Sequence, residues 1–89
     1  MAALTGIVSG RVQGVGFRYF IKRLAVIHEI SGYAKNLADD RVEFLLQGDA
    51  ADIDAMLVEI RRGPEYSRID DLTLSDCDEL TLRGEFQTY

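Results

Sequence analysis

The chain has 89 residues, of which 47% are hydrophobic and 28% charged, and its net charge is −5. This length suits one small domain without a membrane-spanning helix, since no apolar run approaches the roughly 20 residues that such a helix requires. The acidic net charge argues against a general nucleic-acid-binding protein, because those proteins neutralise phosphates with lysine and arginine.

Residues 4–12 have a mixed composition compatible with a first β-strand. From residue 17 onward the apolar residues recur at spacings of three and four, which predicts a helix with one apolar face. We expect this helix to end before Gly32, because glycine readily adopts the left-handed conformation found after helix ends. The predicted apolar face consists of Phe17, Phe20, Ile21, Leu24, Ile27 and His28.

Two strands are predicted next, over residues 32–37 and residues 41–48. The link over residues 38–40 is short enough for the two strands to form an antiparallel hairpin. The second strand alternates, with Val42, Phe44 and Leu46 predicted to face the core and Glu43 and Gln47 to face outward.

A second helix follows the hairpin. Asp49 is predicted to cap its N-terminus, with Asp52 as a weak capping-box partner, and Gly63-Pro64 to end it. Further strands are expected near residues 67–75 and, with a weaker pattern, near residues 82–88. The apolar face of the second helix consists of Ile53, Met56, Leu57 and Ile60.

The predicted order of elements is β-α-β-β-α-β with a further terminal strand. This order is typical of ferredoxin-like sandwiches. We therefore expect an α+β fold in which an antiparallel sheet of four to five strands carries both helices on one face. Because this fold hosts many unrelated activities, it does not by itself indicate a function.

The most unusual stretch is GRVQGVGFRYF, residues 10–20, at the junction between the first strand and the first helix. Gly14 and Gly16 allow the backbone to curl so that successive N–H groups point into one concavity. The helix N-terminus adds unpaired N–H groups and a positive dipole end, and Arg18 adds a planar set of donors. These donors converge on a volume the size of an anion, so phosphate is the expected ligand. A tight turn that merely requires glycine is the alternative, and the spacing fits neither dinucleotide-binding nor P-loop motifs.

The charged residues are unevenly distributed along the chain. Residues 1–36 have a net charge of +4 and residues 37–89 a net charge of −9. A positive region on an acidic protein suits a small anion, although a chance distribution of solvated charges is the alternative. With Cys77 as the single cysteine and His28 as the single histidine, we expect neither an internal disulfide nor a metal site. We expect a cytoplasmic protein without a cofactor, and a structural role for His28.

Residues 10–18, GRVQGVGFR, resemble the signature of the acylphosphatase family: Gly, then Val-Gln-Gly-Val, any residue, and Phe-Arg. A second family pattern occurs at residues 32–36, GYAKN. Two motifs in register, on an independently inferred order of elements, are hard to produce by chance. Val42, Gly48, Gly63, Pro64 and the closing residues 86–89 also resemble the family, so the resemblance covers essentially residues 1–89 as one acylphosphatase-like domain.

The resemblance implies a small acylphosphatase, which hydrolyses the carboxyl-phosphate bond of acyl phosphates without a metal. By similarity, Arg18 would bind the phosphoryl group and Asn36 would orient the attacking water. The implied partners are small-molecule acyl phosphates, with phosphate or other small oxyanions as product or inhibitor, and no nucleic acid or membrane; we expect a monomer. The implied phosphate-binding loop consists of Gln13, Gly14, Val15, Gly16, Phe17 and Arg18, and the side chain of Gln13 has the alternative role of bracing the loop.

Three other functions share parts of this pattern. A non-catalytic phosphate-binding module would keep Arg18 and the glycines but make Asn36 dispensable. The acylphosphatase-like domain of hydrogenase maturation proteins belongs to far longer chains with cysteine-rich zinc segments. An RNA-binding sheet would need exposed aromatic residues, where the strand over residues 41–48 offers Glu43 and an inward Phe44 instead.

The sequence departs from the family at Asp40, where the family usually has glycine. A turn at this point tends to need a positive φ, which costs a non-glycine residue about 1 kcal/mol and aspartate less. We therefore predict that Asp40→Gly stabilises the fold without changing turnover. Tyr33 also replaces the commoner tryptophan.

Overall fold

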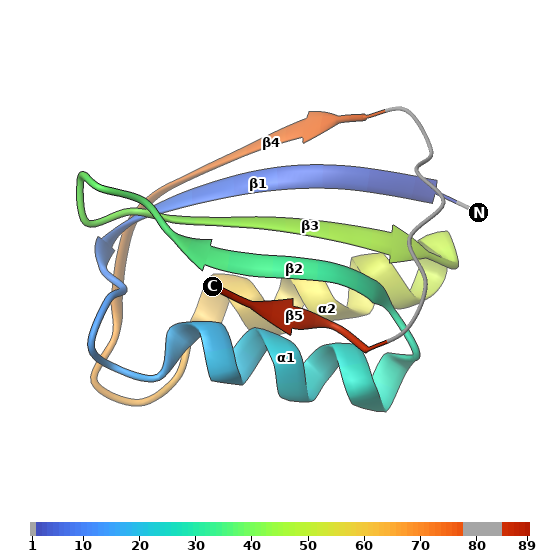
Figure 1. The fold of residues 1–89 in the computed structure, drawn as a ribbon, viewed down its shortest axis with the longest axis horizontal. Helices are drawn as coiled ribbons and strands as arrows, with labels where there is room; N and C mark the ends of the chain where they lie inside the picture. Colours follow the sequence, from blue (N-terminus) through green and yellow to red (C-terminus); the bar gives the residue numbers. More distant parts are fainter. Residues whose placement is uncertain (1, 78–84) are drawn as a thin grey trace.

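The structure is a computed structural model that describes residues 2–77 and 85–89. Both helices lie on one face of a five-stranded sheet (Figure 1), and the predicted β-α-β-β-α-β order is confirmed. The part of the last predicted strand over residues 82–84 lies outside the described residues. The elements are β1 (Ala2–Arg11), α1 (Phe17–His28), β2 (Ser31–Asn36), β3 (Val42–Gly48), α2 (Ala50–Arg62), β4 (Arg68–Asp76) and β5 (Gln87–Thr88).

The strands are ordered β4-β1-β3-β2-β5 across the sheet. Strands β1 to β4 pair antiparallel, as predicted. Strand β5, however, pairs parallel with β2, with Gln87 opposite Tyr33 and Thr88 opposite Ala34. Because the pairing of β5 with β2 is parallel and the other pairings are antiparallel, the sheet is mixed rather than wholly antiparallel. This pairing brings the last residues of the chain beside the end of β2 (Figure 1).

The core lies between the sheet and the two helices. Val42, Phe44 and Leu46 of β3 are fully buried there, as the alternation predicts. Gln47 lies on the other face of the sheet but is only 5% exposed, since β3 is an interior strand flanked by β1 and β2. Gln47 therefore points outward, as predicted, but is buried rather than exposed. The predicted apolar face of α2 is confirmed by the burial of Ile53, Met56, Leu57 and Ile60.

The buried face of α1 is narrower than predicted. Phe17, Ile21 and Ala25 are buried, whereas Ile27 is 70% exposed. At about 100° per residue, Ile27 lies roughly 120° around the helix from Ile21, which turns it away from the sheet. Phe20 and Leu24 are partly buried against the core.

The N-terminal cap of α2 agrees with the prediction, but its capping box does not form. Asp49 accepts a hydrogen bond from the backbone N–H of Ala51 at 2.9 Å, and Gly63 follows the last helical turn. The side chain of Asp52 contacts His28 instead, with 3.1 Å between Oδ1 and Nδ1. His28 thus links α1 to α2, at the end of α1 opposite its N-terminus.

The helix α1 ends before Gly32, as predicted, but another residue takes the left-handed position. Glu29, with φ 56°, takes the left-handed position after the helix, and its N–H bonds back to the helix carbonyls. Gly32 lies inside β2, where an added Cβ would collide with the backbone oxygen of Leu45 on β3. Glycine is therefore required at this position by the close approach of β3, not by the helix end.

No helix in residues 2–77 and 85–89 combines the length and apolar character needed to cross a membrane.

Candidate active site

The loop between β1 and α1 owes its shape to two glycines. Gly14 has φ 73° and Gly16 has φ 79°, both in the left-handed region that other residues enter only with strain. A Cβ added at either position would meet no atom within 4 Å. Glycine is needed here for backbone conformation, and the space in front of the loop is open.

The first turn of α1 presents unpaired donors to that space. The first helical hydrogen bond runs from the N–H of Phe20 to the oxygen of Gly16 at 2.9 Å, so the three preceding N–H groups have no intrahelical acceptor. Gly16 provides no side-chain cap, and the first turn contains no acidic residue. The positive end of the α1 dipole is therefore available to an anion.

Arg18 is held in place by the last residue of the chain. Its Nη1 donates to the backbone oxygen of Tyr89 at 2.7 Å. The same oxygen accepts the backbone N–H of Asn36 at 3.0 Å, and the N–H of Tyr89 donates to Ala34 at 2.9 Å. One backbone oxygen thus links the two predicted catalytic residues. Among the described residues no aspartate or glutamate forms a salt bridge with Arg18, which leaves its other N–H groups available to a ligand.

These groups surround a cavity of about 180 Å³. A cavity of this size admits a phosphoryl group and the atoms next to it. The structure brings together five predicted site residues in its lining: Gly14, Gly16, Phe17, Arg18 and Asn36. The lining also includes Val12, Tyr19 and Thr88, which the sequence did not single out.

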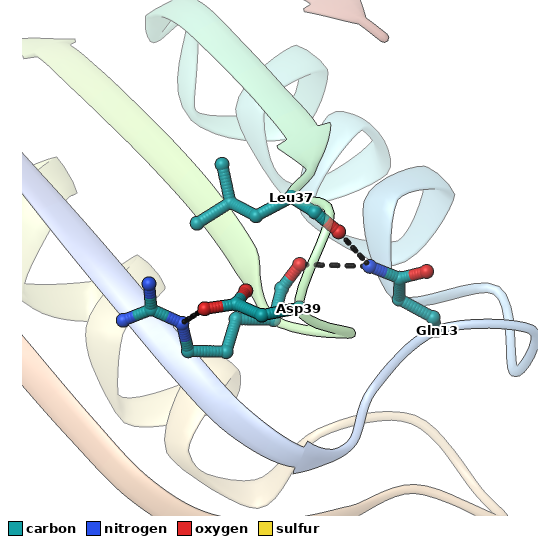
Figure 2. Close-up of polar contacts among 4 residues, drawn as sticks. Gln13, Leu37 and Asp39 are labelled. Carbon is teal, nitrogen blue, oxygen red and sulfur yellow. Dashed lines mark hydrogen bonds and ion pairs between the residues drawn. The ribbon is translucent and has the colours of Figure 1, made fainter.

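Two residues of the predicted loop do not line this cavity. Val15 packs partly buried against the core. Gln13 turns its side-chain amide toward the turn between β2 and β3 (Figure 2), where it bonds the backbone oxygens of Leu37 and Arg41. Of the residues missed, Tyr19 could have been found from its place next to Arg18 in the first turn of α1. Thr88 belongs to the closing residues that resemble the family, but its place in the lining depends on the pairing of β5 with β2.

A cluster on the sheet supports the position of Tyr89. The ring of Tyr33 packs edge-on against the ring of Tyr89, with 6.2 Å between centroids. The hydroxyl of Tyr33 donates to Glu43 at 2.9 Å, and Lys35 lies 3.4 Å from the same carboxylate oxygen. Burial, followed by the hydrogen bond to Glu43, raises the pKa of Tyr33 to about 12. Tyr33 therefore remains protonated and able to donate to Glu43 well above neutral pH.

Comparison with known proteins finds similarity along nearly the whole chain. The acylphosphatase family model matches residues 4–88. An acylphosphatase of Deinococcus radiodurans is 42% identical over 86 residues, which are 97% of this chain and 98% of that protein. The crystal structure of acylphosphatase from Bacillus subtilis superposes with a TM-score of 0.94 at 32% identity, covering 100% of this chain and 99% of that one.

The fold also matches one part of a much larger protein. Full-length HypF, crystallised in a phosphate- and nucleotide-bound form, superposes with a TM-score of 0.90 at 28% identity. The match covers 99% of this chain but 12% of the HypF chain.

Proposed function

Because the chain belongs to the acylphosphatase family, we propose that it hydrolyses the carboxyl-phosphate bond of small acyl phosphates to a carboxylate and inorganic phosphate. One observation carries the proposal. The glycine loop, the first turn of α1, Arg18 and Asn36 line the same cavity, and one backbone oxygen of Tyr89 connects Arg18 with Asn36.

The phosphoryl group binds where the donors converge. The unpaired N–H groups at the start of α1 and the free N–H groups of Arg18 face its oxygens, and the helix dipole adds to the attraction. Phosphoryl transfer proceeds through a loose transition state, in which charge spreads over the equatorial oxygens. Fixed donors that match this charge stabilise the transition state without needing to reorganise.

Asn36 orients the attacking water. It lies exposed at the end of β2, and its side chain forms no hydrogen bond to another described residue. A neutral amide holds the water without repelling the substrate's negative charge, as a carboxylate would. The water oxygen forms the new P–O bond, the carboxylate leaves with the electrons of the broken P–O bond, and a phosphate oxygen takes the proton.

The reaction needs no metal and no acidic group of the protein. A carboxylate leaves readily without being protonated, and Arg18 with the helix N-terminus supplies the positive charge that a cation would provide elsewhere. Phosphate and similar oxyanions bind the same cavity as product or inhibitor. We also propose that residues 1–89 act as a single acylphosphatase-like domain, as a monomer in the cytoplasm.

Phosphate release from benzoyl phosphate in the presence of EDTA tests the proposal. Arg18→Ala and Asn36→Ala are compared with wild type, and Arg23→Ala serves as a control that removes an exposed basic residue of α1 outside the cavity. We expect Arg18→Ala to lower kcat/KM by about 30- to 5,000-fold, the effect of losing roughly 2–5 kcal/mol of charged contact. Arg23→Ala should stay within about twofold of wild type. Circular dichroism verifies that each variant is folded.

A different result would indicate the non-catalytic alternative. If the wild type released no phosphate, yet bound inorganic phosphate with an affinity that Arg18→Ala weakened, the chain would be a phosphate-binding module. If Asn36→Ala hydrolysed benzoyl phosphate as fast as wild type, the role assigned to Asn36 would be wrong.

A further inference from the structure

The side chain of Gln13 makes contacts that the proposed reaction does not explain. Its Nε2 donates to the backbone oxygen of Leu37 and to the backbone oxygen of Arg41, each at 2.9 Å. Figure 2 shows both hydrogen bonds running from this nitrogen to the turn. Both hydrogens of the amide are thereby used. Gln13 therefore has no side-chain N–H left to donate to a phosphate, and it does not line the cavity.

These two oxygens lie at the base of the turn that joins β2 to β3. The N–H of Leu37 donates to the oxygen of Arg41 at 2.8 Å and closes the turn. The ion pair between Asp39 and Arg41, at 2.6 Å, is internal to the turn. Among the described residues, the hydrogen bonds that join residues 37–41 to the β1–α1 loop all come from Gln13.

The turn begins directly after Asn36, so the amide of Gln13 bonds the backbone one residue beyond Asn36. On one side, the N–H of Asn36 is bound to the oxygen of Tyr89, which also binds Arg18. On the other side, the carbonyl oxygen of the following residue, Leu37, accepts a hydrogen bond from Gln13. The direction of the Asn36 side chain thus depends on the backbone held at these two points.

We propose that Gln13 is a positioning residue for the attacking water: its amide fixes Asn36 relative to the phosphate-binding loop. The inference rests on the proposed function. A water in line with the bond that breaks is effective only if its holder stays close to the productive geometry, and a displacement of about 1 Å can cost roughly a hundredfold in rate.

The surroundings of Gln13 indicate which of the two segments that it joins, the β1–α1 loop or the turn between β2 and β3, depends on its hydrogen bonds. The loop is anchored on both sides of Gln13 by the side chains of Val12 and Phe17, each 1% exposed. The turn, by contrast, consists of the exposed residues 38–40. Loss of the amide should therefore displace the turn and Asn36 while the phosphate-binding loop keeps its conformation.

A double-mutant cycle on benzoyl phosphate hydrolysis tests the inference. Gln13→Met has nearly the same side-chain length but no donors, and it is measured alone and in an Asn36→Ala background. We expect it to lower kcat by about ten- to a hundredfold in the wild type and by less than about twofold when Asn36 is absent. KM and the inhibition constant of inorganic phosphate should change by less than about twofold. Gln87→Met is the matched control, because among the described residues the amide of Gln87 bonds only the backbone oxygen of Glu85, at 3.0 Å, and it should leave kcat unchanged.

Gln13→Asn provides a second variant that keeps the amide but shortens its reach, in case Gln13→Met does not fold. It should lower kcat in the same way, again only when Asn36 is present. Equal losses with and without Asn36, or weaker phosphate binding at unchanged kcat, would overturn the inference and leave Gln13 as a brace of the loop. Both results leave the proposed function intact, whereas a wild type without turnover would overturn the proposed function and this inference together.

Discussion

Asp40 occupies a turn conformation that favours glycine. Its φ is 69°, in the left-handed region, at the third of the three residues that the hydrogen bond from Leu37 to Arg41 encloses at the tip of the hairpin. Three-residue hairpin links commonly place a left-handed residue at this point. The side chain of Asp40 is exposed and forms no hydrogen bond or salt bridge with another described residue. Replacing it with glycine therefore removes strain without removing a contact.

The expected gain in the free energy of unfolding is the difference between two opposing effects. The left-handed conformation costs an ordinary L-residue about 1–2 kcal/mol, and aspartate less because its short polar side chain tolerates it. Glycine gives back about 0.4–1 kcal/mol, since it increases the conformational entropy of the unfolded chain. We expect Asp40→Gly to raise the free energy of unfolding by about 0.5 kcal/mol, which corresponds to roughly 2–4 °C in Tm for a domain of this size.

Thermal and urea unfolding of Asp40→Gly and Asp39→Gly measure this effect. The two variants change the net charge equally, but Asp39 has no positive φ and accepts a hydrogen bond from Nε of Arg41 at 2.6 Å. Asp39→Gly should therefore lower Tm, while Asp40→Gly raises it. A fall in Tm for Asp40→Gly, or equal shifts in both variants, would refute this account of the turn. Turnover of Asp40→Gly should match wild type, because Asp40 does not line the cavity.

Two further predictions concern charged and titratable groups. Arg18→Lys should lower kcat/KM for benzoyl phosphate nearly as much as Arg18→Ala, because a lysine lacks the planar fork that serves both Tyr89 and the phosphoryl group; recovery of most of the activity would contradict this reading. The pKa of Tyr33 rises from 10.0 to about 12 on folding, so the folded chain retains the phenolic proton to higher pH than the unfolded chain does. The resulting stabilisation is full below pH 10 and is lost as the pH rises through 12. Tyr33→Phe should flatten the decline of Tm between those pH values, and parallel curves for the two proteins would rule out this contribution.

Much of the secondary structure could be predicted because its signals are local. Asp49 and Gly63 bound α2 through contacts within one turn of the helix, and the alternation in β3 follows directly from strand geometry. Where a distant segment decided the outcome, the prediction was incomplete. The first helix does end before Gly32, but glycine is needed there because of the close approach of Leu45 on β3, and Glu29 takes the left-handed position after the helix.

The candidate site likewise contains residues that the local sequence identifies and a residue that it does not. Gly14, Gly16 and Arg18 are neighbours in sequence, so their convergence on an anion-sized volume follows from backbone conformation and the helix dipole. Asn36 was identified through the family resemblance, since nothing in its local sequence distinguishes it from a residue at the entry to a turn.

The sequence alone determined the order of the elements, the caps of α2 and the glycine loop with its adjacent arginine, because each depends on interactions over a few residues. Only the tertiary structure decided that the backbone oxygen of Tyr89 joins Arg18 to Asn36, and that the amide of Gln13 holds the turn after β2. Both arrangements use backbone oxygens, which every residue carries, so no side-chain pattern reveals them. They arise from the parallel pairing of β5 with β2 and from the approach of the β1–α1 loop to the hairpin, contacts that form only when the whole sheet is assembled.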